Sequence, residues 1–133
     1  MRAFILFIVL ISWLEANTVK DYDTSLMWQD NYDAKTILRD WQGAKKYCQE
    51  LILAGYSDWR LPIIKELQSI VDITRHDSAS KKIFKNVASE RYWSASEDVL
   101  STKFAWRVDF DSGNNDVSIK SFSLFVRCVR GRQ

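Results

Sequence analysis

Two cysteines far apart in the sequence constrain the fold of this chain more than any other feature. Cys48 lies in an early helical pattern, and Cys128 lies in a strand pattern near the end. The chain opens with a segment typical of an export signal, so an oxidising compartment is accessible to it. A cysteine pair there indicates a disulfide rather than a metal or redox site. We therefore expect a cross-link between Cys48 and Cys128.

Residues 1–16 are predicted to be a signal peptide. Arg2 supplies a positive start, an almost unbroken apolar run extends from Ala3 to Leu14, and Ala16 is the small residue at the expected cut. The run is shorter than the roughly 20 residues of a spanning helix. We therefore expect export to the periplasm, the cell surface or the medium, with no stable membrane anchor after cleavage. A permanent anchor is the weaker alternative.

Residues 17–133 are predicted to form one domain. The whole chain has only four glycines and one proline, and no low-complexity stretch marks a linker. The formal net charge of +2 excludes neither anionic nor neutral ligands. Residues 19–29, with turn-forming residues between two apolar stretches, predict a short hairpin or edge strand.

The first helix is predicted to begin after Asp40, a good N-cap, and to end before Gly55. Between them, Trp41, Cys48 and Ile52 belong to an apolar stripe with spacings of three and four. Cys48 therefore faces the core of the predicted helix.

A second helix is predicted over residues 62–72, with Pro62 in its first turn. Ile63 cannot act as a capping side chain, so we expect this helix to be weakly capped. Residues 75–91 are polar and irregular, and they predict a loop with a short helical turn.

Alternation with period two predicts strands in the last third of the chain. Asp111 to Asn114 is strong turn chemistry, because Gly and Asn tolerate positive φ, and it predicts a hairpin. Cys128 shares a strand face with Leu124 and Val126, so its sulfur points inward. The predicted strands cover residues 92–96, 104–110, 117–122 and 124–129.

This order of elements is an α+β arrangement that resembles the C-type-lectin-like fold. The first-helix signature of that superfamily resembles W-Q-G-A-K-K-Y-C (Trp41 to Cys48), and its closing strand resembles F-V-R-C-V-R (Phe125 to Arg130). A narrower resemblance, to the Lcl C-terminal domain family, rests on G-Y-S-D-W-R-L-P-I-I-K-E-L-Q-S-I (Gly55 to Ile70), Y-W-S-A-S and A-W-R-V-D-F.

The resemblance implies two helices packed on a small antiparallel sheet, with the ends joined by the disulfide. It also implies a bacterial exported domain, and the best-known relative is a surface adhesin whose C-terminal domain engages sulfated polysaccharides. We expect a noncatalytic recognition domain for an extracellular or envelope glycan, with an anionic one favoured. The alternative is a protein-interaction or assembly module of the cell envelope. Such a module could act as a homo-oligomer. We expect no nucleic-acid partner and no cofactor.

Six residues are candidates for ligand binding. The lysines among them would lie on one side of a helical turn, although a solvated face is the commoner explanation of such a pattern. An ion pair between Asp58 and Arg60 that organises the loop around Trp59 is favoured over a ligand contact there. The candidates are Lys81, Lys82, Lys85, Arg91, Trp59 and Arg60.

Other conspicuous residues receive structural interpretations. Trp41, Trp93 and Trp106 are expected in the core, and Arg127, between buried positions, is expected to be structural. His76 is expected in a loop, away from any catalytic triad. The oxygen-rich segment 109–116 is expected to be a hairpin tip, with calcium as the alternative, because its spacing is not that of a calcium loop.

Overall fold

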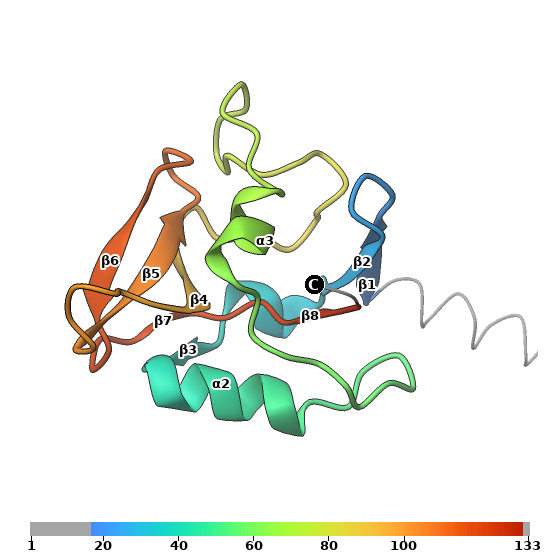
Figure 1. Cartoon of the computed structure of the whole chain (residues 1–133). Coiled ribbons are helices and arrows are strands. Elements are labelled where there is room, and N and C mark those ends of the chain that lie inside the picture. The colour runs from blue at the N-terminus through green and yellow to red at the C-terminus, as the bar shows by residue number, and fades with distance from the viewer. Residues whose placement is uncertain (1–16, 132–133) are drawn as a thin grey trace, which may run out of the picture.

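A computed structural model describes residues 17–131 and begins with a hairpin (Figure 1). Residues 1–16, the predicted signal peptide, and residues 132–133 lie outside the described residues. Strands β1 (Thr18–Asp21) and β2 (Leu26–Gln29) pair antiparallel, which confirms the predicted hairpin.

The strands form two sheets rather than the single antiparallel sheet that was predicted. One has three strands in the order β1-β2-β8, and the other has five in the order β3-β7-β4-β5-β6. The pair β4–β7 is parallel and the other pairs are antiparallel. The α+β class is therefore confirmed, with a mixed larger sheet. The remaining strands are β3 (Leu38–Arg39), β4 (Arg91–Glu97), β5 (Phe104–Asp109), β6 (Asn115–Ile119), β7 (Leu124–Phe125) and β8 (Val129–Arg130).

Helix α2 (Trp41–Glu50) begins as predicted, because the Asp40 carboxylate accepts the Gly43 N–H at 2.8 Å. It ends at Glu50, so the predicted end at Gly55 is wrong. Ala54 and Gly55 both have positive φ, and they form the turn that brings Leu53 and Tyr56 together. The left-handed glycine thus belongs to a tight turn instead of a helix C-terminus, and Ile52, predicted on the core stripe, is 77% exposed.

Helix α3 (Ile64–Gln68) is shorter than the predicted helix over 62–72 and begins after Pro62. Ile63 provides no capping side chain, as expected. Its backbone N–H is nevertheless satisfied, because it donates to the Glu66 carboxylate at 3.0 Å.

Residues 72–90 contain no helix, so the predicted helical turn there is wrong. The backbone N–H groups of Lys85 and Asn86 donate instead to the carboxylate of Asp30, a buried residue of another segment. A 3₁₀-helix η1 (Tyr32–Lys35), which the sequence pattern did not indicate, follows Asp30.

The predicted strand over 124–129 is divided between the two sheets. Its first part is β7, and its last part, β8, pairs with β2. Arg127 lies between them with its guanidinium fully buried, bonded to the carbonyls of Gln29 and Asn86 and 3.3 Å from an Asp30 carboxylate oxygen. These partners give Arg127 the structural role that was expected, and they hold the segment where it leaves one sheet for the other.

The larger sheet has a hydrophobic core on each face, because neighbouring residues of a strand point to opposite sides. Trp93 packs with Trp41 and the other core residues of α2, while Tyr92 packs with Leu67 of α3. In Figure 1, α2 lies below the segment that runs from β7 to β8, and α3 lies above it. The sheet therefore separates the two helices.

The Cys48–Cys128 disulfide forms as predicted and joins α2 to the segment between β7 and β8, with the two Cα atoms 5.5 Å apart. Trp41 and Trp93 are buried, as expected. Trp106 is only half-buried and belongs to neither core, so its predicted core position is wrong. It pairs with Val117 of the edge strand β6, which is also only half-buried.

Candidate functional site

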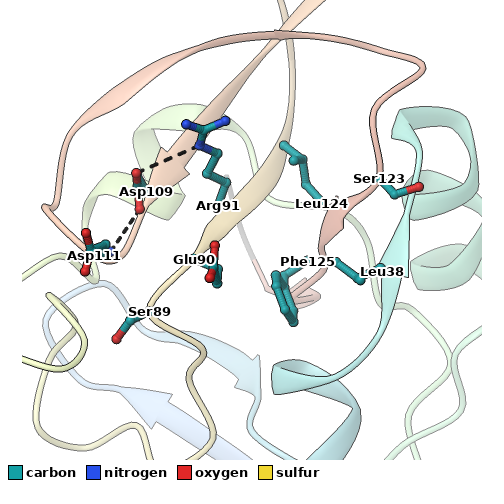
Figure 2. Close-up of a pocket in the computed structure, with 9 residues that line it drawn as sticks. All are labelled: Leu38, Ser89, Glu90, Arg91, Asp109, Asp111, Ser123, Leu124 and Phe125. Atoms are coloured by element: carbon teal, nitrogen blue, oxygen red, sulfur yellow. Dashed lines mark hydrogen bonds and ion pairs between the residues drawn. The ribbon is translucent and has the colours of Figure 1, made fainter.

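A groove of about 550 Å³ opens where β4 begins and β5 ends, beside β7 and β3 (Figure 2). Antiparallel pairing of β4 with β5 sets Arg91 opposite Asp109, so the two side chains lie on one face of the sheet. The lining residues are Leu38, Ser89, Glu90, Arg91, Asp109, Asp111, Ser123, Leu124 and Phe125.

The charged groups of the groove are loosely paired. The Arg91 Nε lies 3.9 Å from an Asp109 carboxylate oxygen, and the Arg91 side chain is 51% exposed. Asp109 also accepts the backbone N–H of Asp111 at 3.0 Å. Glu90 and Asp111 are exposed. The groove thus offers one guanidinium donor and several carboxylate acceptors to a ligand.

Three apolar side chains and one unsatisfied hydroxyl also line the groove. Leu124 is buried, Phe125 is half-buried, and Leu38 is 46% exposed. The Ser89 Oγ is shielded from solvent and finds no hydrogen-bond partner among residues 17–131. Buried hydroxyls are normally bonded, so Ser89 has an unused donor and acceptor in the wall of the groove.

Of the six residues predicted to bind ligand, only Arg91 lines this groove. Lys81 lies in another hollow, of about 470 Å³, and its Nζ is 3.2 Å from Asp21 and 3.0 Å from Asp23. Burial lowers the pKa of Lys81, but hydrogen bonds to Asp23 and Asp21 more than offset this effect, so its pKa is raised. Lys82 and Lys85 are exposed in the same loop.

The other two predicted residues are engaged in structure. Trp59 is 3% exposed, and its indole N–H donates to the Leu53 carbonyl. Arg60 binds the Glu66 carboxylate through both terminal nitrogens, each at 2.7 Å. The cluster expected from the sequence is therefore distributed over separate places in the fold.

The predicted Asp58–Arg60 ion pair is wrong, because Asp58 pairs instead with Arg130. The Arg130 guanidinium donates to both Asp58 carboxylate oxygens, at 2.7 and 3.1 Å, and lies 3.6 Å from the centre of the Tyr56 ring. The hydrogen bond from Arg130 lowers the pKa of Asp58. Successive side chains here reach different partners, which adjacency in sequence cannot show.

Sequence reasoning did not assign Ser89, Glu90, Phe125 or the Arg91–Asp109 pair to a common groove. The groove could have been predicted in one way, by pairing the predicted strands 92–96 and 104–110 in the correct register, which sets Arg91 opposite Asp109. Asp109 and Asp111 were considered only as part of the turn with its calcium alternative. Within residues 17–131, no three His, Cys, Asp or Glu side chains are placed to hold a metal ion.

The family model of the Lcl C-terminal domain matches residues 17–130, nearly the whole of the described chain. The chain belongs to the Lcl C-terminal domain family. In this member of the family, the segment from Gly55 to Pro62 begins with the tight turn at Gly55 and contains the buried Trp59. Its Arg60 binds Glu66 and its Asp58 binds Arg130. No curated protein matches the sequence. Within the described residues, no helix combines the length and apolar character needed to cross a membrane.

Proposed function

We propose that this protein is an exported, noncatalytic recognition domain with a C-type-lectin-like fold, and that the groove at Arg91 binds an extracellular or envelope glycan. The observation that carries the proposal is the combination in one open groove of a half-exposed guanidinium, carboxylates and the exposed side chain of Leu38. Sites for small ligands typically combine apolar surface with a few convergent polar groups.

Each part of the groove suits a part of a sugar. The guanidinium of Arg91 can donate to ring and hydroxyl oxygens, while the carboxylates of Asp109 and Asp111 can accept from hydroxyls. Charge-assisted hydrogen bonds of this kind are stronger than neutral ones. Leu38, which is 46% exposed, provides apolar surface for the C–H face of a pyranose ring.

The charges of the groove favour a neutral glycan over an anionic one. Arg91 is accompanied by Glu90, Asp109 and Asp111, so carboxylates outnumber the cation. Of the three lysines predicted to bind an anionic glycan, Lys82 and Lys85 are exposed, whereas Lys81 is already paired with two aspartates. A neutral glycan and an anionic glycan would therefore bind different surfaces, the groove at Arg91 and the loop that carries Lys82 and Lys85.

Two further features support export and the absence of catalysis. A disulfide is typical of proteins that fold in an oxidising compartment, and the apolar run of residues 3–14 is typical of a signal peptide. Both cysteines are consumed by the disulfide, so neither offers a thiol nucleophile. His76 is exposed in the loop after α3, where it resembles no general base.

The test is a glycan array probed with the disulfide-bonded domain of residues 17–133, followed by titration of the best glycan. We expect Arg91→Ala to weaken binding at least about 10-fold, or about 1.4 kcal/mol, and Asp109→Asn to weaken it less. Lys46→Ala, which removes an exposed cation on α2, should bind like the parent.

The same array distinguishes binding of a neutral glycan from binding of an anionic one. A neutral glycan in the groove should resist added salt and should not depend on Lys82 or Lys85. Retention on a sulfated polysaccharide that is lost in the Lys82→Ala/Lys85→Ala double variant but not in Arg91→Ala would contradict the groove proposal.

A further inference from the structure

Strand β6 forms one edge of the five-stranded sheet and has no strand beyond it in the described part of the chain (Figure 1). Such an edge presents backbone N–H and C=O groups to which another strand can pair. The opposite edge, β3, has only two residues. β6 is therefore the longest open edge of this sheet.

One face of β6 is apolar and poorly covered. Val117 pairs with Trp106, and Ile119 pairs with Phe104. None of these four side chains belongs to either core, and Ile119 is 41% exposed. Apolar surface beside an open strand edge favours association.

The other face of β6 is polar and has a symmetric pattern of charge. Ser118 lies at the centre, with Asp116 two residues before it and Lys120 two residues after it. Asp116 is exposed. Lys120 lies on the same face, where its Nζ is 3.2 Å from Glu97 and 4.2 Å from the centre of the Trp41 ring.

We propose that two copies of this chain pair through β6, antiparallel, about a two-fold axis at Ser118. In this register Val117 lies opposite Ile119 of the second copy, and Asp116 lies opposite its Lys120. Each charge thus meets an opposite charge, and each apolar residue meets an apolar one. The rows Trp106–Val117 and Ile119–Phe104 of the two copies become continuous across the axis.

The direction of the backbone groups agrees with this register. The Lys120 N–H donates inward to the Lys103 carbonyl at 3.0 Å. Alternation along a strand then directs the backbone groups of Val117 and Ile119 outward, where they can bond to Ile119 and Val117 of the second copy. Ser118 faces its own counterpart in a non-hydrogen-bonded pair, the closer of the two antiparallel pair types.

A single copy shields part of this edge by itself. The Asp116 carboxylate accepts the outward N–H of Val117 at 2.7 Å, and the Ile119 carbonyl accepts the N–H of Phe122. Pairing requires Asp116 to release that N–H and turn to Lys120 of the second copy. The inference rests on β6 alone and holds whether or not the groove binds a glycan.

Cysteine cross-linking tests the register. With residues 17–133 under mild oxidation, Ser118→Cys should form a covalent dimer, because the two residues face each other at the axis. Asp116→Cys, two positions away on the same face, lies opposite Lys120 and should form much less. Equal cross-linking of both variants, or none, would overturn the proposed register.

Charge reversal tests the association without a new cysteine. Sedimentation velocity should show a dimer for the parent, a monomer for Asp116→Lys, and a dimer again for Asp116→Lys/Lys120→Asp, in which the charges are exchanged. Circular dichroism and the urea unfolding midpoint of the monomeric variant report whether it remains folded. A parent that stays monomeric at every concentration tested would overturn the proposal.

Discussion

The segment from Gly55 to Glu66 and the groove at Arg91 both carry charged side chains, but they use them differently. In the segment, Arg60 and Glu66 are joined by two contacts of 2.7 Å, and Glu66 is 8% exposed. In the groove, Arg91 and Asp109 approach only to 3.9 Å, and Arg91 is half exposed. The arginine and glutamate of the segment are tightly paired, while the charged groups of the groove are only loosely paired.

This contrast shows why the strongest family motif says little about function. The Gly55 segment stabilises the end of the chain: the backbone of Arg60 pairs with Val129, and its guanidinium also donates to the Gly131 carbonyl at 3.2 Å. Asp58 binds Arg130 in the same strand. The residues of this motif therefore attach β8, whereas the groove takes Asp109 and Phe125 from other motifs and Arg91 from outside them.

The largest expected effect is on stability, from removing the disulfide next to this segment. Cys48→Ala/Cys128→Ala should lower the free energy of unfolding by about 2–5 kcal/mol, because the unfolded chain gains entropy and the native core loses a packed link. Urea unfolding followed by tryptophan fluorescence measures the change. An unaltered midpoint would show that the non-covalent contacts of β8 suffice.

Arg60→Ala should lower the free energy of unfolding by about 2 kcal/mol, since it leaves the nearly buried Glu66 carboxylate without its guanidinium. Asp58→Asn is the matched control in the same segment, and its effect should be much smaller because the Asp58 side chain is 63% exposed. Equal losses in the two variants would contradict the difference in burial.

A smaller effect is expected from Tyr47 of α2 at high pH. Burial is the main cause that raises the pKa of Tyr47 to about 12; Gln29 opposes the rise and Asp33 adds to it. The folded state therefore keeps its proton longer than the unfolded chain, so stability is complete below pH 10 and falls as pH rises towards 12.

After allowance for solvent screening, the loss attributable to Tyr47 is about 1 kcal/mol. Urea unfolding at about pH 9 and about pH 11 measures it, with Tyr47→Phe as the reference that lacks the ionisable group. The parent should lose more stability than Tyr47→Phe between these two conditions. Parallel losses would assign the pH dependence to other groups.

The smallest effect on stability is expected in the groove. Arg91→Ala should change the free energy of unfolding by no more than about 0.5 kcal/mol, because the side chain is half exposed and loosely paired. The same variant is expected to lose glycan binding. Differential scanning calorimetry measures the first quantity, and a large drop in melting temperature would show that Arg91 is structural like Arg60.

Local patterns in the sequence predicted much of the fold. The N-cap at Asp40, the core-facing positions of Trp41 and Cys48 and the inward face of Cys128 are all confirmed. The prediction of one continuous last strand was wrong, because the chain leaves one sheet for the other at Arg127. The buried partners of Arg127 come from β2 and from the loop before β4. Such partners lie far away in the sequence and leave no periodic signal.

The candidate site was far less predictable. Arg91 was singled out with lysines that the structure places elsewhere, and its actual neighbour, Asp109, faces it only through the register of β4 and β5. Trp106 was assigned to the core by alternation, which identifies a strand face but not whether anything covers that face.

What the sequence alone decided is the α+β class, the family and the cysteine pair, because these depend on local periodicity, turn chemistry and a motif within one segment. The tertiary structure alone decided which charged groups pair, which remain open and which strand forms the edge. Those outcomes depend on strand register and on contacts between distant segments, whose energies no single stretch of sequence contains.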